Sequence, residues 1–371
     1  MTSRLWQQRL LFAALPFSLF LGGCITDSLF GGGTAEPVAP AGVYRSTDHG
    51  DTWATVNQVL TVGGERLTMD DVNVRAITLD PTDRQTVYVG TSGNGLYYTY
   101  DAARRWWQSG PIRSGSINAI AIPNDVAKRC TVYLASANRV LKTIDCGRFW
   151  EQVYFDTRTN ELTKSLLVHQ KNPDTVFIGM STGEVLRSKD AGTSWETVAR
   201  MQGSVIQLLS APLNPELLYA LVAKKGVWVS EDGGTTWTDA GETMKKDFKG
   251  SEVVTAAAID TSRPDTFIVA SKYGLVRTTD AGKTWVALSL LTPTGKITIT
   301  DVALRPDNSS ELYYTTPTTF YRSYDAGGTW ETQPLPAINA NAKIIVDPKV
   351  NGLLYLGIAR IVQQQESLIG F

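Results

Sequence analysis

Residues 323–330 read SYDAGGTW, and six further stretches of the chain follow the same eight-residue pattern, S/T-x-D-x-G-x-T-W. We call these stretches boxes 1 to 7. They begin at Ser46, Thr99, Thr143, Ser188, Ser230, Thr278 and Ser323. Their third-position aspartates lie 42 to 53 residues apart along the chain. A pattern repeated at such a period is typical of proteins built from stacked structural repeats.

Two residue types anchor every box. The aspartates are Asp48, Asp101, Asp145, Asp190, Asp232, Asp280 and Asp325, and the closing tryptophans are Trp53, Trp106, Trp150, Trp195, Trp237, Trp285 and Trp330. The carboxylate and the first-position hydroxyl can accept N–H bonds within a turn, and the glycine favours positive φ. The tryptophan can pack between neighbouring repeats. We therefore interpret these residues as structural rather than catalytic.

Boxes 2 and 3 depart from the pattern. Box 2 has Ala103 in place of glycine and Arg105 in place of threonine, and box 3 has Phe149 in place of threonine. We expect these two turns to be less well hydrogen-bonded than the others. His49 occupies a position of box 1 that the pattern leaves free, so we expect its side chain to be exposed to solvent.

A second series of turns alternates with the boxes. It is marked by prolines, most of them beside Asp or Asn, at Pro81, Pro123, Pro173, Pro215, Pro264, Pro306 and Pro348. Proline in this setting is typical of turns. One repeat, residues 74–110, therefore reads as strand, proline turn, strand, short loop, strand, box and strand. Four short strands per repeat predict one blade of a β-propeller.

The two series are offset at the ends of the chain. Box 1 has no proline turn before it, and the last proline turn has no box after it. Six complete and two half repeats thus predict an all-β, seven-bladed propeller with four-stranded antiparallel blades over residues 42–371. Its closing blade would join strands from about 343–358 with a hairpin from about 42–57, so that the N- and C-terminal strands share one blade. Arg360–Glu366 is a competing third strand for the place assigned to Val43–Thr47.

The N-terminal segment, residues 1–23, differs from the rest of the chain. Arg4 and Arg9 precede an apolar run, Leu10–Leu21, which is followed by two glycines and Cys24. The run is short for a membrane span, and small residues before a cysteine give a signal peptidase access to the backbone. The segment resembles the lipobox of bacterial lipoproteins, which implies cleavage before Cys24 and lipidation of that residue. An ordinary signal peptide or an uncleaved anchor helix is the alternative.

Residues 24–41 read as a flexible tether because they are rich in Gly, Ala and Pro and lack hydrophobic periodicity. Residues 25–41 could span at most about 56 Å. In lipoproteins an Asp after the lipidated cysteine favours the inner membrane, and Ile25 stands there instead. We therefore expect a lipid-anchored protein of the bacterial cell envelope, on the periplasmic side or at the outer membrane.

Charge sets further limits on function. The formal net charge is −1, and removal of residues 1–23, with two arginines and no acids, changes it to −3. Such a balance gives no general attraction to nucleic acid. His49 and His169 are the only histidines and have no neighbouring Cys or His, so no zinc pattern is present. We predict no metal, no cofactor and no nucleic-acid partner.

The boxes resemble those of the Asp-box (BNR) propellers over residues 42–358. That family includes sialidases and xyloglucan-cleaving enzymes, but also binding proteins similar to the photosystem II assembly factor and to sortilin. The early Arg-Ile-Pro motif of sialidases is absent here. Xyloglucan-cleaving relatives set two carboxylates between two propellers, whereas these repeats predict one. The resemblance therefore implies a non-catalytic scaffold that binds or assembles proteins.

The alternative is a glycan-binding or glycoside-hydrolase-like surface protein. It would gain support if exposed aromatic residues such as Trp107 and Trp228 lined a groove that also held two carboxylates about 5–10 Å apart.

Cys130 and Cys146 flank a tight loop at Ala137-Asn138. Counting outward from that loop places Cys130 opposite residue 145 or 146, so the two can form a cross-strand disulfide in an oxidising compartment. Such a bridge would stabilise the fold by about 3 kcal/mol on the chain-entropy account. Two buried thiols are the alternative.

In a propeller of this kind, the loops between second and third strands share one face with the connections between blades. The longest connections are about Gln58–Asn73 and Asp239–Glu252. The candidate binding residues on this face are Arg66, Arg113, Arg139, Arg158, Lys224, Lys225, Lys272 and Tyr273. Residues 101–164 also hold ten basic and six acidic residues. We expect a monomeric propeller that binds a protein partner, which could be membrane-associated. The alternative is that these charged side chains are simply solvated loop residues with no binding role.

Overall fold

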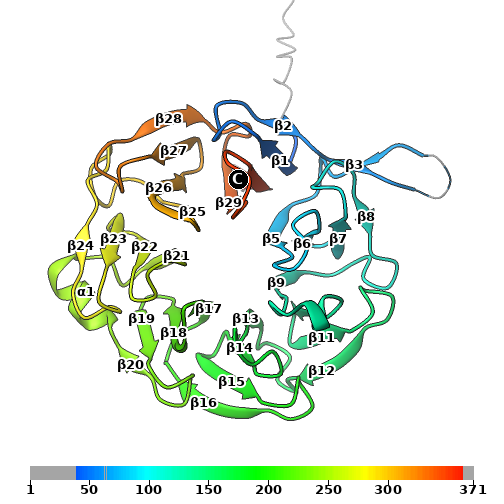
Figure 1. The fold of residues 1–371 in the computed structure, drawn as a ribbon, viewed down its shortest axis with the longest axis horizontal. Helices are drawn as coiled ribbons and strands as arrows, with labels where there is room; N and C mark the ends of the chain where they lie inside the picture. Colours follow the sequence, from blue (N-terminus) through cyan, green and yellow to red (C-terminus); the bar gives the residue numbers. More distant parts are fainter. Residues whose placement is uncertain (1–38, 62, 64, 362–371) are drawn as a thin grey trace, which may run out of the picture. The chain divides into compact units, whose positions relative to one another are not determined.

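The structure is a computed structural model that describes residues 39–61, 63 and 65–361. Figure 1 shows seven blades arranged in a ring. Each blade is an antiparallel sheet of four strands. The fold predicted from the boxes is therefore confirmed. The segment that contains Cys24 lies outside the described residues.

The innermost strands surround the central channel. In blades 1 to 7 they are β29 (Ala340–Val346), β5 (Val74–Leu79), β9 (Ile117–Ala121), β13 (Thr163–Val168), β17 (Val205–Ala211), β21 (Val254–Ile259) and β25 (Asp301–Arg305). Many of their residues are only half-buried because one side of each strand faces the channel.

The second strands are the most deeply buried. They are β30 (Leu354–Arg360), β6 (Val87–Thr91), β10 (Val132–Ser136), β14 (Val176–Met180), β18 (Asn214–Val222), β22 (Phe267–Ser271) and β26 (Asn308–Thr315). Runs such as VYLAS in β10 and VFIGM in β14 are buried at every position. Such unbroken apolar runs suit strands that neighbouring blades cover on both sides.

The third and fourth strands complete each blade toward the rim. The third strands are β1 (Gly42–Ser46), β7 (Leu96–Thr99), β11 (Arg139–Thr143), β15 (Glu184–Ser188), β19 (Gly226–Ser230), β23 (Leu275–Thr278) and β27 (Thr319–Ser323). The fourth strands are β2 (Ala54–Thr55), β8 (Trp107–Gln108), β12 (Glu151–Phe155), β16 (Glu196–Arg200), β20 (Thr238–Asp239), β24 (Val286–Ala287) and β28 (Glu331–Pro334). The fourth strands are short and largely exposed, which limits the sheet edge open to other chains.

Three elements interrupt the repeat. They are a hairpin of β3 (Gln58–Val59) and β4 (Leu67–Thr68), the 3-10 helix η1 (Val126–Lys128) and the helix α1 (Gly241–Asp247). The hairpin and α1 lie in connections between blades, and η1 lies in the proline turn of blade 3. These segments differ from blade to blade, so the repeat pattern carried no signal for them. Among the described residues, no helix is both long and apolar enough to cross a lipid bilayer.

Blade 1 closes the ring. Strand β1 lies between β30 and β2, and its register pairs Gly42 with Ile358 and Ser46 with Leu354. The predicted sharing of one blade by the two ends of the propeller is therefore confirmed. Strand β30 ends at Arg360, β1 occupies the place of the third strand, and residues 362–366 of the competing segment lie outside the described residues.

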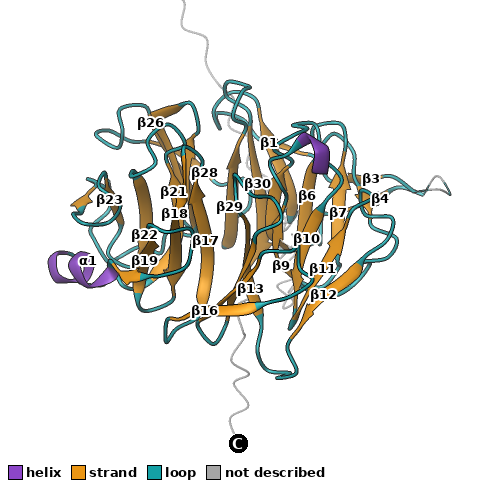
Figure 2. Ribbon diagram, turned by 60° about the horizontal axis from the view of Figure 1, so that its bottom comes forward, coloured by secondary structure: helices purple, strands orange, loops and turns teal. Residues whose placement is uncertain are grey.

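The antiparallel register defines two faces. Each inner strand begins opposite the end of the second strand, as in the pairs Val74–Thr91 and Val254–Ser271. The turns after the second strands and the connections between blades therefore share one face, which we call the connection face. The boxes and proline turns form the opposite one, the box face. In Figure 2, α1 marks the connection face and η1 the box face.

Box 1 shows how the repeat folds locally. The Ser46 hydroxyl accepts the Gly50 N–H at 2.8 Å and donates to Asp48 at 2.7 Å. The Asp48 carboxylate accepts the N–H and the hydroxyl of Thr52 at 3.0 and 2.5 Å. Gly50 has a φ of +90°, and His49 before it is also left-handed at +59°. Two successive left-handed residues recur in all seven boxes, whereas the sequence had indicated only the second.

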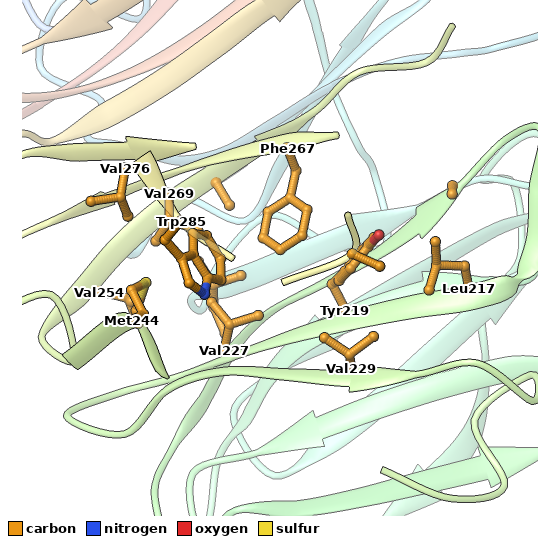
Figure 3. Packing of buried hydrophobic residues seen from close by; sticks show 14 residues of the cluster. Leu217, Tyr219, Val227, Val229, Met244, Val254, Phe267, Val269, Val276 and Trp285 are labelled. Carbon is orange, nitrogen blue, oxygen red and sulfur yellow. The ribbon is translucent and has the colours of Figure 1, made fainter. Parts of the chain in front are cut away.

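The core consists of apolar clusters between neighbouring blades. Figure 3 shows the cluster between blades 5 and 6, where Tyr219, Phe267 and Trp285 pack together with ring centroids 4.2 and 5.3 Å apart. Met244 extends from α1 into the same cluster and is fully buried. The box tryptophan thus joins its own blade to the preceding one, as inferred from the sequence, and α1 is anchored by the same contacts.

Candidate binding face

The predicted binding residues occupy three parts of the connection face. Arg66 lies in the β3–β4 hairpin, which Figures 1 and 2 show projecting beyond the rim of the ring. Arg113, Arg139 and Arg158 belong to the turn and connections of blade 3. Three further residues, Lys224, Lys225 and Lys272, lie together with Tyr273 on blades 5 and 6. Of these three groups, only the last is joined by further exposed lysines from neighbouring segments to form a larger surface.

Four lysines that the sequence did not single out join this group. We call the resulting set the lysine patch. It comprises Lys224, Lys225, Lys245, Lys246, Lys249, Lys272 and Lys296, all of them exposed. They come from two turns, from the connection that contains α1 and from the connection between blades 6 and 7. Only the ring geometry brings these segments together.

Backbone contacts hold the segments of the lysine patch side by side. The Lys272 N–H donates to the Val253 carbonyl at 2.9 Å, and the Gly295 N–H donates to the Tyr273 carbonyl at 3.2 Å. A Cβ on Gly241 would lie 2.4 Å from the Lys225 carbonyl oxygen, so only glycine permits α1 to start this close to the blade 5 turn. The lysine patch is therefore a fixed surface.

Apolar groups accompany the lysines. The rings of Phe248 and Tyr273 meet edge to face with centroids 5.2 Å apart, and both are half-buried. Leu291, in the next connection, is 59% exposed. Aromatic and aliphatic side chains therefore lie among the exposed lysines of the patch.

Few acids offset these charges. The connection that holds α1 and its flanks contributes four: Asp239, Glu242, Asp247 and Glu252. Seven lysines against four acids leave a local excess of three positive charges. Two of the acids are engaged by backbone groups, since Asp239 accepts the Gly241 N–H and Glu252 accepts the Gly250 N–H. The face is therefore locally basic although the whole chain is slightly acidic.

Arg158 differs from the patch lysines because it is ion-paired. Its guanidinium contacts Asp156 and Glu184 at 2.6 Å each. The hydrogen bonds from Arg158 lower the pKa of Asp156 to about 2 despite partial burial. Arg200 also contacts Glu184, at 3.4 Å. Arg158 thus stabilises the connection between blades 3 and 4 and offers little free charge to a partner.

The basic excess of residues 101–164 does not form one surface. Six of its ten basic residues lie toward the box face: Arg104, Arg105, Lys128, Arg129, Lys142 and Arg148. Arg105 bonds its own box aspartate, Asp101, and Lys128 pairs with Asp174. A count along the sequence could not separate the two faces, because successive strands carry neighbouring residues to opposite ends of a blade.

His49 is only partly exposed, with 25% of its side chain accessible, whereas the sequence suggested a solvent-exposed position. Its Nδ1 lies 2.9 Å from Glu311 of blade 7, and the Glu311 carboxylate, only 3% exposed, also accepts bonds from Tyr313 and Arg305. This network spans the junction between blades 7 and 1. The correction arises because His49 belongs to the closing blade, where a neighbour from far along the sequence covers it.

Cys130 and Cys146 are joined by a disulfide, with Cα atoms 4.3 Å apart. The bridge ties the segment before β10 to box 3 at the box face. It lies on the face opposite the lysine patch.

The features expected of a glycan site are separated in the fold. Trp107 lies on β8 of blade 2, whereas Trp228 lies on β19 of blade 5 and is half-buried. Asp301 is the carboxylate that lines the central channel among the described residues. A second cavity, on the box face between blades 2 and 3, contains Asp80 and Asp83, but both carboxylates bond their own turn.

Comparison with known proteins supports the fold but leaves the activity open. No family model matches the chain. A xyloglucanase from Paenibacillus sp is 24% identical over 264 residues, which cover 66% of this chain and 23% of the enzyme. The vacuolar protein sorting/targeting protein 10 of Schizosaccharomyces japonicus is 36% identical over 76 residues, 20% of this chain and 5% of that protein. The matched region thus spans at most about a quarter of these relatives.

The similar solved structures also include both a peptide-binding protein and an enzyme. YCF48 bound to D1 peptide has a TM-score of 0.59 at 17% identity, covering 78% of this chain and 94% of that one. The GH74 xyloglucanase from Xanthomonas campestris has a TM-score of 0.58 at 18% identity, covering 77% of this chain and 51% of the enzyme. At these identities the likeness shows a shared propeller fold, and function is argued from the site.

Proposed function

We propose that this protein is a lipid-anchored, non-catalytic propeller of the bacterial cell envelope that binds or assembles a protein partner through its connection face. The observation that carries the proposal is the lysine patch, where two turns and two connections between blades place exposed positive charge beside partly exposed apolar side chains. On the box face, by contrast, the box carboxylates are engaged in their own turns.

The composition of the patch indicates the chemistry of the partner. An acidic segment with one or two apolar side chains would match the lysines by charge, and Phe248, Tyr273 and Leu291 by contact. Complementary charge of this kind raises the association rate and fixes the orientation of the partner, and the apolar contacts slow dissociation. Salt should therefore weaken the complex.

The position of residue 39 supports an orientation relative to the membrane. Arg360, at the end of β30, bonds the Ala39 carbonyl at 3.2 Å, and the Ala41 N–H bonds the Asp70 carbonyl at 2.7 Å. Both contacts lie at the connection face, where β1 begins. A tether of residues 25–41, if lipidated at Cys24, would join the propeller on the same face as the lysine patch. A partner in or on the membrane is then within reach.

The relatives support binding over catalysis in one respect. YCF48 bound to D1 peptide is a propeller of this size in complex with a peptide. The xyloglucanases that match are much longer than this chain. A glycan-related role remains the alternative, and detectable hydrolysis or binding of xyloglucan by the purified protein would favour it over the proposal.

Charge reversal tests the proposal. A Lys224→Glu, Lys225→Glu, Lys272→Glu variant reverses the patch, and a Lys189→Glu, Lys283→Glu, Lys349→Glu variant makes the same charge change on the box face. Affinity purification from envelope membranes, read by mass spectrometry, should recover the same partners with the wild type and the box-face variant. The patch variant should lose them. Equal recovery by both variants would show that the connection face is not the binding surface.

The anchor is tested separately. Cys24→Ser should abolish labelling by a radioactive fatty acid and move the protein from the membrane to the soluble fraction. Continued membrane association without labelling would instead favour an uncleaved anchor helix.

A further inference from the structure

The central channel contains a second, independent concentration of positive charge. A cavity of about 530 Å³ is lined by the inner strands of all seven blades. An adjoining cavity of about 470 Å³ shares Arg75, Thr255 and Lys343 with it and reaches Arg360 at the end of β30. Together they open the channel toward the connection face.

Bulges in the inner strands determine which side chains line this channel. In blade 2 the register passes from Val74–Thr91 to Ala76–Gly90, which leaves Arg75 as the extra residue. Lys164 is the extra residue in blade 4, where pairing passes from Thr163 to Ser165. A bulged residue is released from the alternation of the strand and can be directed differently from its neighbours. Arg75 and Lys164 both line the 530 Å³ cavity.

Asn118 of blade 3 links these two positions. The Arg75 guanidinium donates to Ser116 Oγ at 2.8 Å and to Asn118 Oδ1 at 2.9 Å. The Asn118 amide then donates to the Thr163 carbonyl at 2.9 Å, next to Lys164. Both hydrogen-bond partners of Arg75 are neutral, so its charge is oriented but not compensated.

Lys164 lacks a counter-ion among the described residues. Within residues 39–61, 63 and 65–361, neither a carboxylate nor a hydrogen-bond acceptor contacts its ammonium group. Burial, and next the charge of Arg75, lower the pKa of Lys164. An exposed arginine on blade 2 and a half-buried lysine on blade 4 therefore lie close enough for their charges to repel across blade 3, and an anion between them would relieve this repulsion.

The acid in the channel is already engaged. Asp301 pairs with Lys343 at 3.5 Å and accepts the Ile344 N–H at 2.9 Å, which bridges blades 7 and 1. Asp301 is therefore committed to blades 7 and 1, and Arg75 and Lys164 have no ion-pair partner in the part of the chain that the structure describes. Apolar side chains such as Ile77 and Ile206 line the same space. Cations beside apolar walls suit an organic acid better than a bare inorganic ion.

We propose that the channel binds a carboxylate-bearing organic anion, held by Arg75 and Lys164, with its carbon chain against the apolar walls. Arg75 can form a bidentate pair with the carboxylate, since Asn118 and Ser116 engage only one of its terminal nitrogens. Two sources share this chemistry, a free dicarboxylate and the C-terminal carboxylate of an extended peptide. The site is distinct from the lysine patch and does not depend on it.

Calorimetric titration of the full-length protein in detergent tests the site with three probes: succinate, an acetylated tripeptide acid and the same tripeptide as its amide. Succinate, the peptide acid or both should bind, and the amide should bind at least about tenfold more weakly than the acid if the peptide binds. Binding of both acids assigns the site to carboxylates in general, and binding of one alone identifies the source.

Lys164→Gln is the decisive variant because Lys164 has no hydrogen-bond or ion-pair partner within the described ranges. It should weaken binding at least about tenfold. Arg75→Gln should do the same, while Lys225→Gln, on the lysine patch, should leave the affinity within about twofold of the wild type. Thermal melting should show Lys164→Gln to be at least as stable as the wild type. No heat with either acid at millimolar concentration, unchanged affinity in Lys164→Gln, or equal binding of acid and amide would each overturn the proposal.

Discussion

The two faces of the ring use their charged residues in opposite ways. On the box face, each box aspartate bonds donors from its own turn, as Asp190 does with the N–H and hydroxyl of Ser194 at 2.8 and 2.6 Å. On the connection face, the patch lysines are exposed, and of these only Lys245 has an ion-pair partner among the described residues, Glu242 at 3.6 Å. The charged groups that hydrogen-bond within the fold are repeated in every blade. The charged groups that are free to contact a partner are confined to a few turns and connections. Changes on one face should therefore alter stability, and changes on the other should alter binding.

The largest expected effect comes from Gly234→Ala in box 5. The new Cβ would lie 2.5 Å from the Phe177 ring, which is fully buried in blade 4 and cannot yield, and φ is +83°. Overpacking and left-handed strain together predict a loss of roughly 2–5 kcal/mol in the free energy of unfolding. Urea denaturation followed by tryptophan fluorescence measures it.

Gly147→Ala in box 3 is the matched control. Its φ is +88°, but the nearest atom to the new Cβ, in Trp150, is 3.5 Å away. Only the backbone strain remains, so the loss should be about 1–2 kcal/mol. Equal losses at the two glycines would show that box packing against the preceding blade adds nothing.

The next largest effect should be a loss of stability at acidic pH, caused by protonation of the box aspartates. The bonds from Ser194 lower the pKa of Asp190 to about 2, and at Asp232 the bonds from Thr236 outweigh burial and give the same result. A lowered folded-state pKa contributes stability above the unfolded value near 4, and this contribution is lost as the pH falls toward 2. The urea midpoint should therefore drop between pH 5 and pH 2.5. The drop should be smaller in a Ser194→Ala, Thr236→Val variant, and an identical drop would contradict this assignment.

Restoring the usual threonine in box 3 should have a smaller effect and should raise the stability of the protein. Phe149 is 79% exposed and provides only its N–H to Asp145, at 3.0 Å. In Phe149→Thr a hydroxyl could donate to Asp145 as Thr329 donates to Asp325 at 2.7 Å. One such hydrogen bond should stabilise the protein by about 0.5–1.5 kcal/mol. A urea midpoint that does not rise would mean that the box 3 turn is limited by something other than this missing donor.

The smallest effect on stability should come from the lysine patch. Lys225→Glu replaces an exposed side chain with no ion-pair partner among the described residues. The free energy of unfolding should stay within about 0.5 kcal/mol of the wild type. A larger loss of stability would show that the lysine patch also has a structural role. The two faces would then not differ in whether their charged residues stabilise the fold.

The blade count and the closing blade could be predicted because every blade repeats the same hydrogen-bonded turn. Ser46, Asp48 and Thr52 act within seven residues of one another, so their spacing is visible in the sequence. The first of the two left-handed residues was missed because His49 and most of its equivalents, four of which are alanine, are residue types that seldom adopt positive φ. Helix α1 was missed because it occurs once and has no side-chain cap at Ala240.

The functional surfaces were less predictable than the fold. Lys224 and Lys272 were identified by their place in turns, but Lys296 joins them only through the contact of Gly295 with Tyr273. Arg75 and Lys164 carry no motif, and their position in the channel depends on bulges whose register the alternation of apolar residues does not specify. A signal exists in retrospect, since each is the second residue of an inner strand.

The pairing of β1 with β30 also has a consequence for biogenesis. Strand β1 is translated about 310 residues before its partner, which at roughly 5–20 residues per second is a delay of about 15–60 s. Throughout that time the edge that β30 will cover is open to incorrect pairing. The order of synthesis thus makes the first strand the last to find its place, and a chaperone that shields residues 42–46 would protect the step on which ring closure depends.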